Sequence, residues 1–267
     1  MLRDWIYNHS TLEIGAVIVA LSVVAAWLGL FVFDRFVDVS VRRRHNDVAG
    51  FIIAIIGVVY AVLLAFIAVA AWANFDNANR VVQQEANLVD NLYRDAIAIP
   101  EPARSAVRED IKQYLRLVID DEWPAQRQHK ADTSGWVAIE KLQSAVAALD
   151  PKTLGQSVVE AEMLKTLNDL YSARRTRLLA ASDGIPNTIW SILVLGGVIT
   201  IAFSFFFGMH SMVMHYAMTG TLAASLALVM VLIVALDWPF RGEVSISPEA
   251  FTTVQQDIAQ QEQQAHR

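Results

Sequence analysis

Long uninterrupted runs of apolar residues occur in two parts of the chain. Residues 14–33 and 48–73 form the first two runs. Each is long enough for a membrane helix, because a hydrocarbon core about 30 Å thick needs roughly 20 apolar residues. Residues 184–236 contain no Asp, Glu, Lys or Arg and are too numerous for one span. They divide at the polar sequence GMHSMVMHY, which leaves spans of about 189–207 and 213–236. The pattern predicts four transmembrane helices.

The residues between the two apolar regions are polar but retain a helical period. Apolar side chains recur at helical spacing through residues 82–99 and 107–119, and the prolines of IPEPA separate these two amphipathic helices. A third helix is expected over 134–149. A fourth is expected to begin at Asp150 as N-cap, with Pro151 in its first position. No alternating strand pattern competes, so the predicted fold class is all-α.

These elements describe an integral membrane protein in which two transmembrane hairpins flank a helical extramembrane domain. The expected divisions are an N-terminal tail and first hairpin at 1–73, the helical domain at 74–183, the second hairpin at 184–236 and a polar C-terminal tail at 237–267.

Composition narrows the functional classes. Hydrophobic residues make up 55% of the 267, and mean hydropathy is +0.38, as expected for a protein whose main partner is the lipid bilayer. The net charge of −6 argues against a nucleic-acid partner. No cysteine is available for a disulfide or a thiolate metal site. No Gly-rich phosphate loop, HExxH or serine elbow occurs, so we predict no enzyme activity, catalytic residue, cofactor or metal.

Small residues recur along one face of the second span, forming what we call the small-residue stripe: Gly50, Ala54, Gly57, Ala61, Ala65 and Ala68. Such residues let helices approach closely in lipid, so the stripe fits a seam within the protomer or between protomers. It also fits the wall of a narrow apolar pore that gates by dewetting. On that interpretation, Gly57, Ala61, Ala65 and Phe66 are the pore or gate candidates.

Polar residues follow where the second span leaves the membrane. Asn74, Asp76 and Asn77 are candidates for a pore mouth, with Glu85 and Asp90 farther along the helix. In a homo-oligomer these side chains would form rings that concentrate small cations. In a protein without a central axis they would be an ordinary solvated helix surface.

Two other groups of residues have side chains that could bind a metal ion. His210 and His215 lie five residues apart, so both rings do not share one helical face, and interfacial turn residues are the alternative. The acidic run Asp120, Asp121 and Glu122 lacks the alternating spacing of a calcium loop and reads as an acidic helix end.

The positions of the arginines indicate on which side of the membrane the helical domain lies. Four of them, Arg35, Arg42, Arg43 and Arg44, lie in the short first connection, which the positive-inside rule places in the cytoplasm. The domain and both termini would then lie together on the periplasmic or extracellular side of a bacterial inner membrane. The arginines on the domain side argue the other way: Arg80, Arg174, Arg175, Arg177 and Arg241.

Several segments together resemble the bacterial bestrophin-like family of membrane proteins. They are GVVYAVLLAF, WANFDNANRVVQQEANLVDNLYRDA, DDEWP and LDWPFRGEVSISPEAF, and the likeness covers nearly the whole chain. The resemblance implies two hairpins around a helical domain and, through a more remote likeness to true bestrophins, an oligomeric ion channel, for anions. True bestrophins carry a proline in the second span and an acidic calcium clasp, neither of which maps here. No functional residue is carried over.

Two functions follow from these observations. The first is a homo-oligomeric channel for passive ion permeation, with the second span lining the axis. The alternative is a non-conducting membrane-anchored sensor or scaffold whose helical domain binds a partner or ligand. The absence of charged residues within the spans motivates this alternative, because intramembrane charges usually mark ion pathways.

Overall fold

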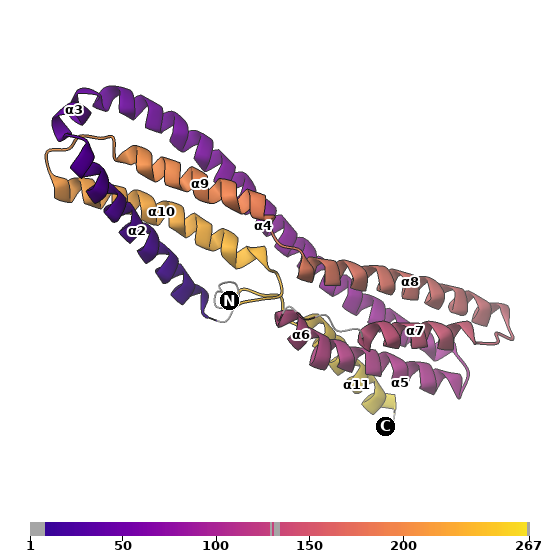
Figure 1. The fold of residues 1–267 in the computed structure, drawn as a ribbon. Coiled ribbons are helices and arrows are strands. Elements are labelled where there is room, and N and C mark those ends of the chain that lie inside the picture. The colour runs from indigo at the N-terminus through magenta and orange to yellow at the C-terminus, as the bar shows by residue number, and fades with distance from the viewer. Residues whose placement is uncertain (1–8, 129, 131–133, 266–267) are drawn as a thin grey trace. The chain divides into compact units, whose positions relative to one another are not determined.

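The computed structural model describes residues 9–128, 130 and 134–265. All regular elements among these residues are helices (Figure 1). They form two compact units. The membrane unit comprises residues 1–73, 184–238 and 242–244, and the helical unit comprises 74–183, 239–241 and 245–267.

Long apolar helices build the membrane unit. They are α2 (Thr11–Phe36), the first part of α4 (Asn46–Asp95), α9 (Asn187–Ser204) and α10 (Met212–Asp237). Four helical stretches among the described residues are long and apolar enough to cross a membrane. The predicted all-α fold with four such helices is therefore confirmed. Helices α2 and α10 lie side by side in Figure 1 and make the most extensive helix contact of this unit.

The two short connections of the membrane unit are tied together by polar contacts. Helix α3 (Val39–Arg44) joins α2 to α4. The Asn46 side-chain amide donates to the Gly208 carbonyl at 3.0 Å and accepts from the Gly208 backbone N–H at 2.9 Å. The buried Arg42 pairs with Asp34 and donates to the Phe205 carbonyl at 3.1 Å. Arg42 therefore neutralises one acidic group instead of adding to an exposed basic cluster.

The second part of α4 begins the helical unit. It is followed by η1 (Ala96–Ala98), α5 (Ala103–Arg116), the π-helical turn η2 (Leu117–Glu122), α6 (Trp123–Arg127), α7 (Ser134–Ala147), α8 (Leu154–Ser182) and α11 (Glu249–Ala265). Apolar side chains from α4, α5, α7, α8 and α11 form one core. Its fully buried members include Leu92, Ile111, Leu142, Leu170 and Phe251.

Two segments of the helical unit differ from the sequence prediction. The predicted cap Asp150 is wrong, because α8 starts at Leu154 and the Thr153 hydroxyl accepts the Gln156 backbone N–H at 3.2 Å. The segment expected as a polar tail contains α11, whose apolar face is buried in the core through Phe251 and Ile258. The other side chains of α11 are mostly polar and include many glutamines, which is why the sequence predicts a polar tail.

Candidate functional site

One face of α4 packs inside the membrane unit, and Tyr60 is at its centre. Its hydroxyl donates to the Leu193 carbonyl at 2.7 Å, and Leu64 is buried beside it. A Cβ atom built on Gly196 of α9 would lie 2.5 Å from the Tyr60 ring, so that glycine is what admits the ring. The close helix contact within the chain thus uses a glycine of α9, and of the small-residue stripe only Ala68 packs against this cluster.

The other members of the small-residue stripe lie outside this cluster. A Cβ atom built on Gly50 or Gly57 would meet no other atom within 4 Å. Ala61 and Ala65 are both exposed in the single chain. Within the described part of the chain these positions are open, so a seam here would be with lipid or with a second protomer.

Phe66 lies on a different face from the other gate candidates. At about 100° per residue, it is about 140° around the helix from Ala61 and about 100° from Ala65. It shares its face with Val58 and Val62, four residues apart along α4. These three side chains are 64%, 49% and 72% exposed in the order Val58, Val62 and Phe66. Helix α4 therefore presents a small-residue face and, adjoining it, a face of large apolar side chains that ends at Phe66.

The mouth candidates lie where α4 enters the helical unit. Asn74 and Asn77 are exposed, and Asp76 forms an exposed ion pair with Arg80 at 3.4 Å, one helical turn away. Such a pair contributes little to stability. These three side chains are available to solvent, as a pore mouth requires, but the single chain does not bring them together.

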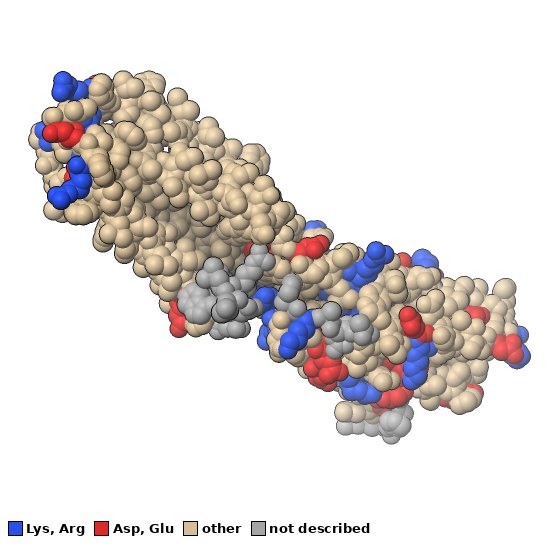
Figure 2. Space-filling view, in the orientation of Figure 1, with Lys and Arg blue, Asp and Glu red and all other residues tan. Residues whose placement is uncertain are grey.

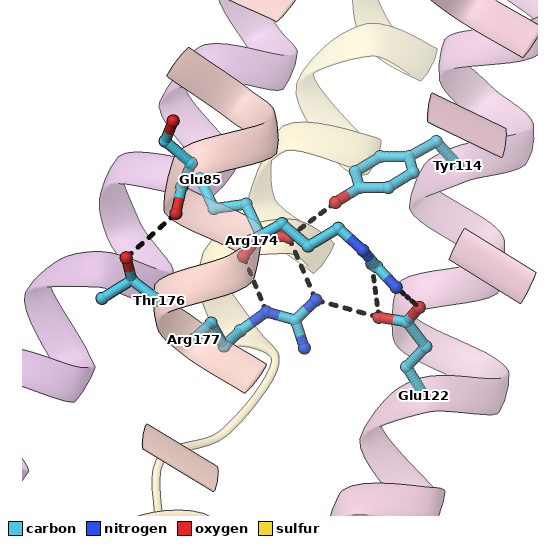
Figure 3. Close-up of polar contacts among 7 residues, drawn as sticks. Glu85, Tyr114, Glu122, Arg174, Thr176 and Arg177 are labelled. Carbon is cyan, nitrogen blue, oxygen red and sulfur yellow. Dashed lines mark hydrogen bonds and ion pairs between the residues drawn. The ribbon is translucent and has the colours of Figure 1, made fainter. Parts of the chain in front are cut away.

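Glu85, expected farther along the helix on a ring or a solvated surface, is buried, so that expectation is wrong. It is fully buried in the helical unit as part of what we call the buried ion cluster: Glu85, Tyr114, Glu122, Arg174 and Arg177 (Figure 3). Arg177 donates to Glu85 through Nε at 2.6 Å and through one terminal nitrogen at 3.0 Å. The same terminal nitrogen lies 2.9 Å from Glu122, so Arg177 bridges both carboxylates.

The remaining contacts complete the buried ion cluster. Arg174 forms a two-pronged pair with Glu122, one prong measuring 2.7 Å. The Tyr114 hydroxyl donates to Glu85 at 2.6 Å. Two carboxylates thus face two guanidinium groups, and the buried formal charge sums to zero. Because an unpaired buried charge is costly, this balance is what lets four ionisable side chains occupy a core.

Local structure explains how Glu122 reaches the cluster. It ends the π-helical turn η2, just before Pro124, which has no amide hydrogen for the α-helical bond to residue 120. Asp120 and Asp121 are exposed, whereas Glu122 is buried. A Cβ atom on Gly135 would lie 2.2 Å from the Glu122 carboxylate and 2.5 Å from Arg174. A side chain at residue 135 would therefore displace the Glu122–Arg174 pair.

The cluster changes the acid–base behaviour of its members. Burial lowers the pKa of Arg177, but the charge and hydrogen bonds of Glu85 outweigh that effect and raise it above its usual value. Burial, together with the neighbouring Glu85 charge, raises the pKa of Tyr114 well above its usual value. Arg177 therefore stays charged, and the Tyr114 phenol keeps its proton.

The histidine pair forms no shared site in the described part of the chain. The Nε2 atom of His215 lies 3.2 Å from the Ser204 carbonyl, and the side chain is buried. Among residues 9–128, 130 and 134–265, no group of three or more His, Asp or Glu side chains is arranged to hold a metal ion.

The family follows from a comparison with known protein domains. The model of the bestrophin-like domain matches residues 20–251. The chain belongs to the bestrophin-like family. This bestrophin-like protein also resembles crystal structures of a bacterial bestrophin homologue from Klebsiella pneumoniae. One single-site variant has a TM-score of 0.67 and 11% identity, with 92% of this chain and 99% of that chain covered.

A second variant of that homologue has a TM-score of 0.67 and 12% identity, and the match covers 93% of this chain and 96% of that chain. A further structure of the same homologue has a TM-score of 0.65 at 12% identity, and the match covers 90% of this chain and 96% of that chain. No sequence among the curated proteins matches the chain. At these identities the similarity to the solved structures shows the fold.

Sequence reasoning missed the buried ion cluster. The sequence pattern places Glu85 on a polar helix surface beyond the mouth, and Arg174 and Arg177 near the membrane boundary. A signal was present, because Arg174 and Arg177 are three residues apart and therefore share a helix face. Glu85 and Glu122 recur within otherwise apolar faces of amphipathic helices. The pairing itself joins residues 92 apart, which a single sequence does not reveal.

Proposed function

We propose that this bestrophin-like protein is a homo-oligomeric pore for passive permeation of small ions, with α4 of each protomer beside a central axis. The observation that carries the proposal is the exposed face of large apolar side chains at Val58, Val62 and Phe66. A ring of such side chains constricts a pore and controls permeation by excluding water. Family membership and the fold shared with bacterial bestrophin homologues support the same conclusion.

The two faces of α4 would then have different roles. Gly57, Ala61 and Ala65 would pack against the neighbouring protomer, since small residues allow close helix contact in lipid. Phe66 would form the narrowest part of the pore. Asn74, Asp76 and Asn77 would form its mouth, where amide and carboxylate oxygens meet hydrated ions.

Ion flux from liposomes tests the constriction. We expect Phe66→Ala to raise chloride, potassium or sodium flux above wild type, because a ring of smaller side chains is wetted more readily. Phe31→Ala is the matched control, since Phe31 is also apolar and 57% exposed but lies on α2. Flux that is equal in Phe66→Ala, Phe31→Ala and wild type would show that Phe66 is not the constriction.

The absence of cysteine makes a second test direct. A thiol reagent should block flux through Phe66→Cys, whereas Ala61→Cys should cross-link protomers on oxidation. If the reagent blocks Ala61→Cys and Ala65→Ser alters flux, the small-residue stripe lines the pore instead. If no variant conducts and the protein is monomeric, the non-conducting anchored sensor or scaffold becomes the better explanation.

We further propose a bacterial inner-membrane location with the helical unit on the periplasmic side. The first connection keeps Arg35, Arg43 and Arg44 exposed, whereas two of the arginines counted on the domain side are buried in ion pairs. An impermeant maleimide applied to intact cells should label Ser172→Cys on α8 and not Ser40→Cys in the connection. The reverse pattern would place the helical unit in the cytoplasm.

A further inference from the structure

A pocket of about 490 Å³ opens on the helical unit, bordered by the end of α4, by α5 and by α11. Three basic side chains, Arg104, Arg108 and Lys112, line it from α5. They are spaced four residues apart, so they share one face of that helix. Charged side chains of both signs are visible over this unit in Figure 2, whereas the long apolar helices of the membrane unit are nearly free of them.

The acidic side chains of the pocket are already engaged. Their contacts are Glu101 with the Ser105 hydroxyl at 2.7 Å, Glu109 with Lys112 at 3.0 Å and Arg116 at 2.8 Å, and Glu262 with Lys112 at 3.0 Å and the Tyr93 hydroxyl at 2.9 Å. Burial raises the pKa of Glu262, but its bonds to Lys112 and Tyr93 outweigh this and lower it. Glu262 is therefore ionised at neutral pH.

Two of the three cations are engaged as well. Lys112 lies between two carboxylates, and Arg104 Nε donates to the Ile99 carbonyl at 2.8 Å. Arg108 differs from both. Within the described part of the chain, no Asp or Glu oxygen lies within 4.0 Å of its guanidinium, and its buried Nε has no hydrogen-bond partner. Among the residues that the structure describes, Arg108 is the cation of this pocket that makes no hydrogen bond or ion pair.

The orientation of Arg108 is fixed by Tyr93. The guanidinium carbon lies 4.6 Å from the centre of the Tyr93 ring, a cation–π contact that restrains the side chain. A guanidinium donates hydrogen bonds through N–H groups that lie in its plane, and a cation–π contact does not use these N–H groups. A planar, prealigned fork matches the two oxygens of a carboxylate or phosphate group.

We propose that this pocket binds a small anion through a carboxylate or phosphate group, with Arg108 as its two-pronged donor and Arg104 as a second positive charge. Because Glu101, Glu109 and Glu262 line the same pocket, we expect the site to favour compact anionic groups. This site does not depend on ion permeation through α4, and a non-conducting protein would retain it.

Isothermal titration of the full-length protein in detergent tests the site. Sodium phosphate and sodium malonate are titrated separately, so the two arms distinguish a phosphate ligand from a carboxylate ligand. We expect at least one to bind with a Kd below about 1 mM, and Arg108→Gln to weaken it by about tenfold or more. Arg175→Gln is the matched control, since Arg175 is an exposed arginine of the same unit outside the pocket.

A second variant covers the case in which Arg108→Gln does not fold. Arg108→Lys keeps the charge and the aliphatic stem but removes the planar fork, and it should also lose affinity relative to wild type. The proposal is overturned if neither anion binds up to about 10 mM. It is also overturned if a folded Arg108→Gln or Arg108→Lys protein binds as tightly as Arg175→Gln.

Discussion

The buried ion cluster gives the sharpest test of how the helical unit is held together. Replacing Arg177 with Met removes three hydrogen bonds to carboxylates, at 2.6, 3.0 and 2.9 Å. Tyr114 would still donate to Glu85, and Arg174 would still pair with Glu122. The cluster would nevertheless keep two negative charges against one positive charge in a place that water does not reach.

The size of the effect follows from that imbalance. Removing one partner from a buried ion pair destabilises a protein by about 3–5 kcal/mol, because the remaining charge is left uncompensated. A loss of 1 kcal/mol lowers the Tm by about 2–4 °C for a chain of roughly this size. We therefore expect Arg177→Met to lower the Tm of the helical unit by about 6–20 °C.

Thermal unfolding of the full chain in detergent, followed by circular dichroism, measures this change. The double variant Arg177→Met with Glu85→Gln restores zero net charge and keeps an acceptor for Tyr114. The loss of unfolding free energy in the double variant should be smaller than the summed losses of the two single variants, by roughly 0.5–3 kcal/mol. Arg175→Met, two residues away and exposed, controls for the loss of any arginine from α8.

Two results would refute this reasoning. If Arg177→Met unfolds at the same temperature as Arg175→Met, the cluster does not stabilise the fold. If the double variant loses as much as the two single variants combined, the residues do not act as a unit.

Three further predictions follow from the same contacts. Gly196→Ala should weaken packing in the membrane unit, since its Cβ would lie 2.5 Å from the Tyr60 ring, and a lower Tm in detergent would reveal this. Gly135→Ala should lower the Tm of the helical unit because its Cβ would lie 2.2 Å from the Glu122 carboxylate, and a Tm equal to wild type would contradict this. Because burial and the Glu85 charge raise the pKa of Tyr114, the unfolded chain ionises this phenol first. The contribution of Tyr114 to stability should therefore be constant below about pH 10 and fall above it, and absorbance titration should show tyrosinate from Tyr114 only on unfolding.

The sequence was sufficient for the elements that local composition controls. The four spans are visible because charge-free runs of the required length are rare outside membranes. The end of α4 was harder to locate. Its composition changes near Asn74, but neither Pro nor Gly interrupts the helix, which continues to Asp95. The start of α8 was misplaced because Asp150 and Thr153 are both good caps, and tertiary context selects Thr153.

The candidate site was less accessible from the sequence, for a physical reason. Phe66 and the small-residue stripe are both apolar, and a sequence does not say which face of a membrane helix packs on its own protomer. The Tyr60 contact with Gly196 supplies that missing information. Glu85 looked like any acidic residue on an amphipathic helix until its partner Arg177 was located 92 residues away.

The core of the helical unit has a consequence for how the chain is made. Its apolar side chains come both from residues before the second hairpin, such as Leu170, and from residues after it, such as Phe251. A ribosome delivers the second group only after α9 and α10 have been synthesised. The two groups meet only if α9 and α10 together return the chain to the side it left. A protein in which one of these helices failed to insert would carry an open, apolar core, which marks it for removal by cellular quality control.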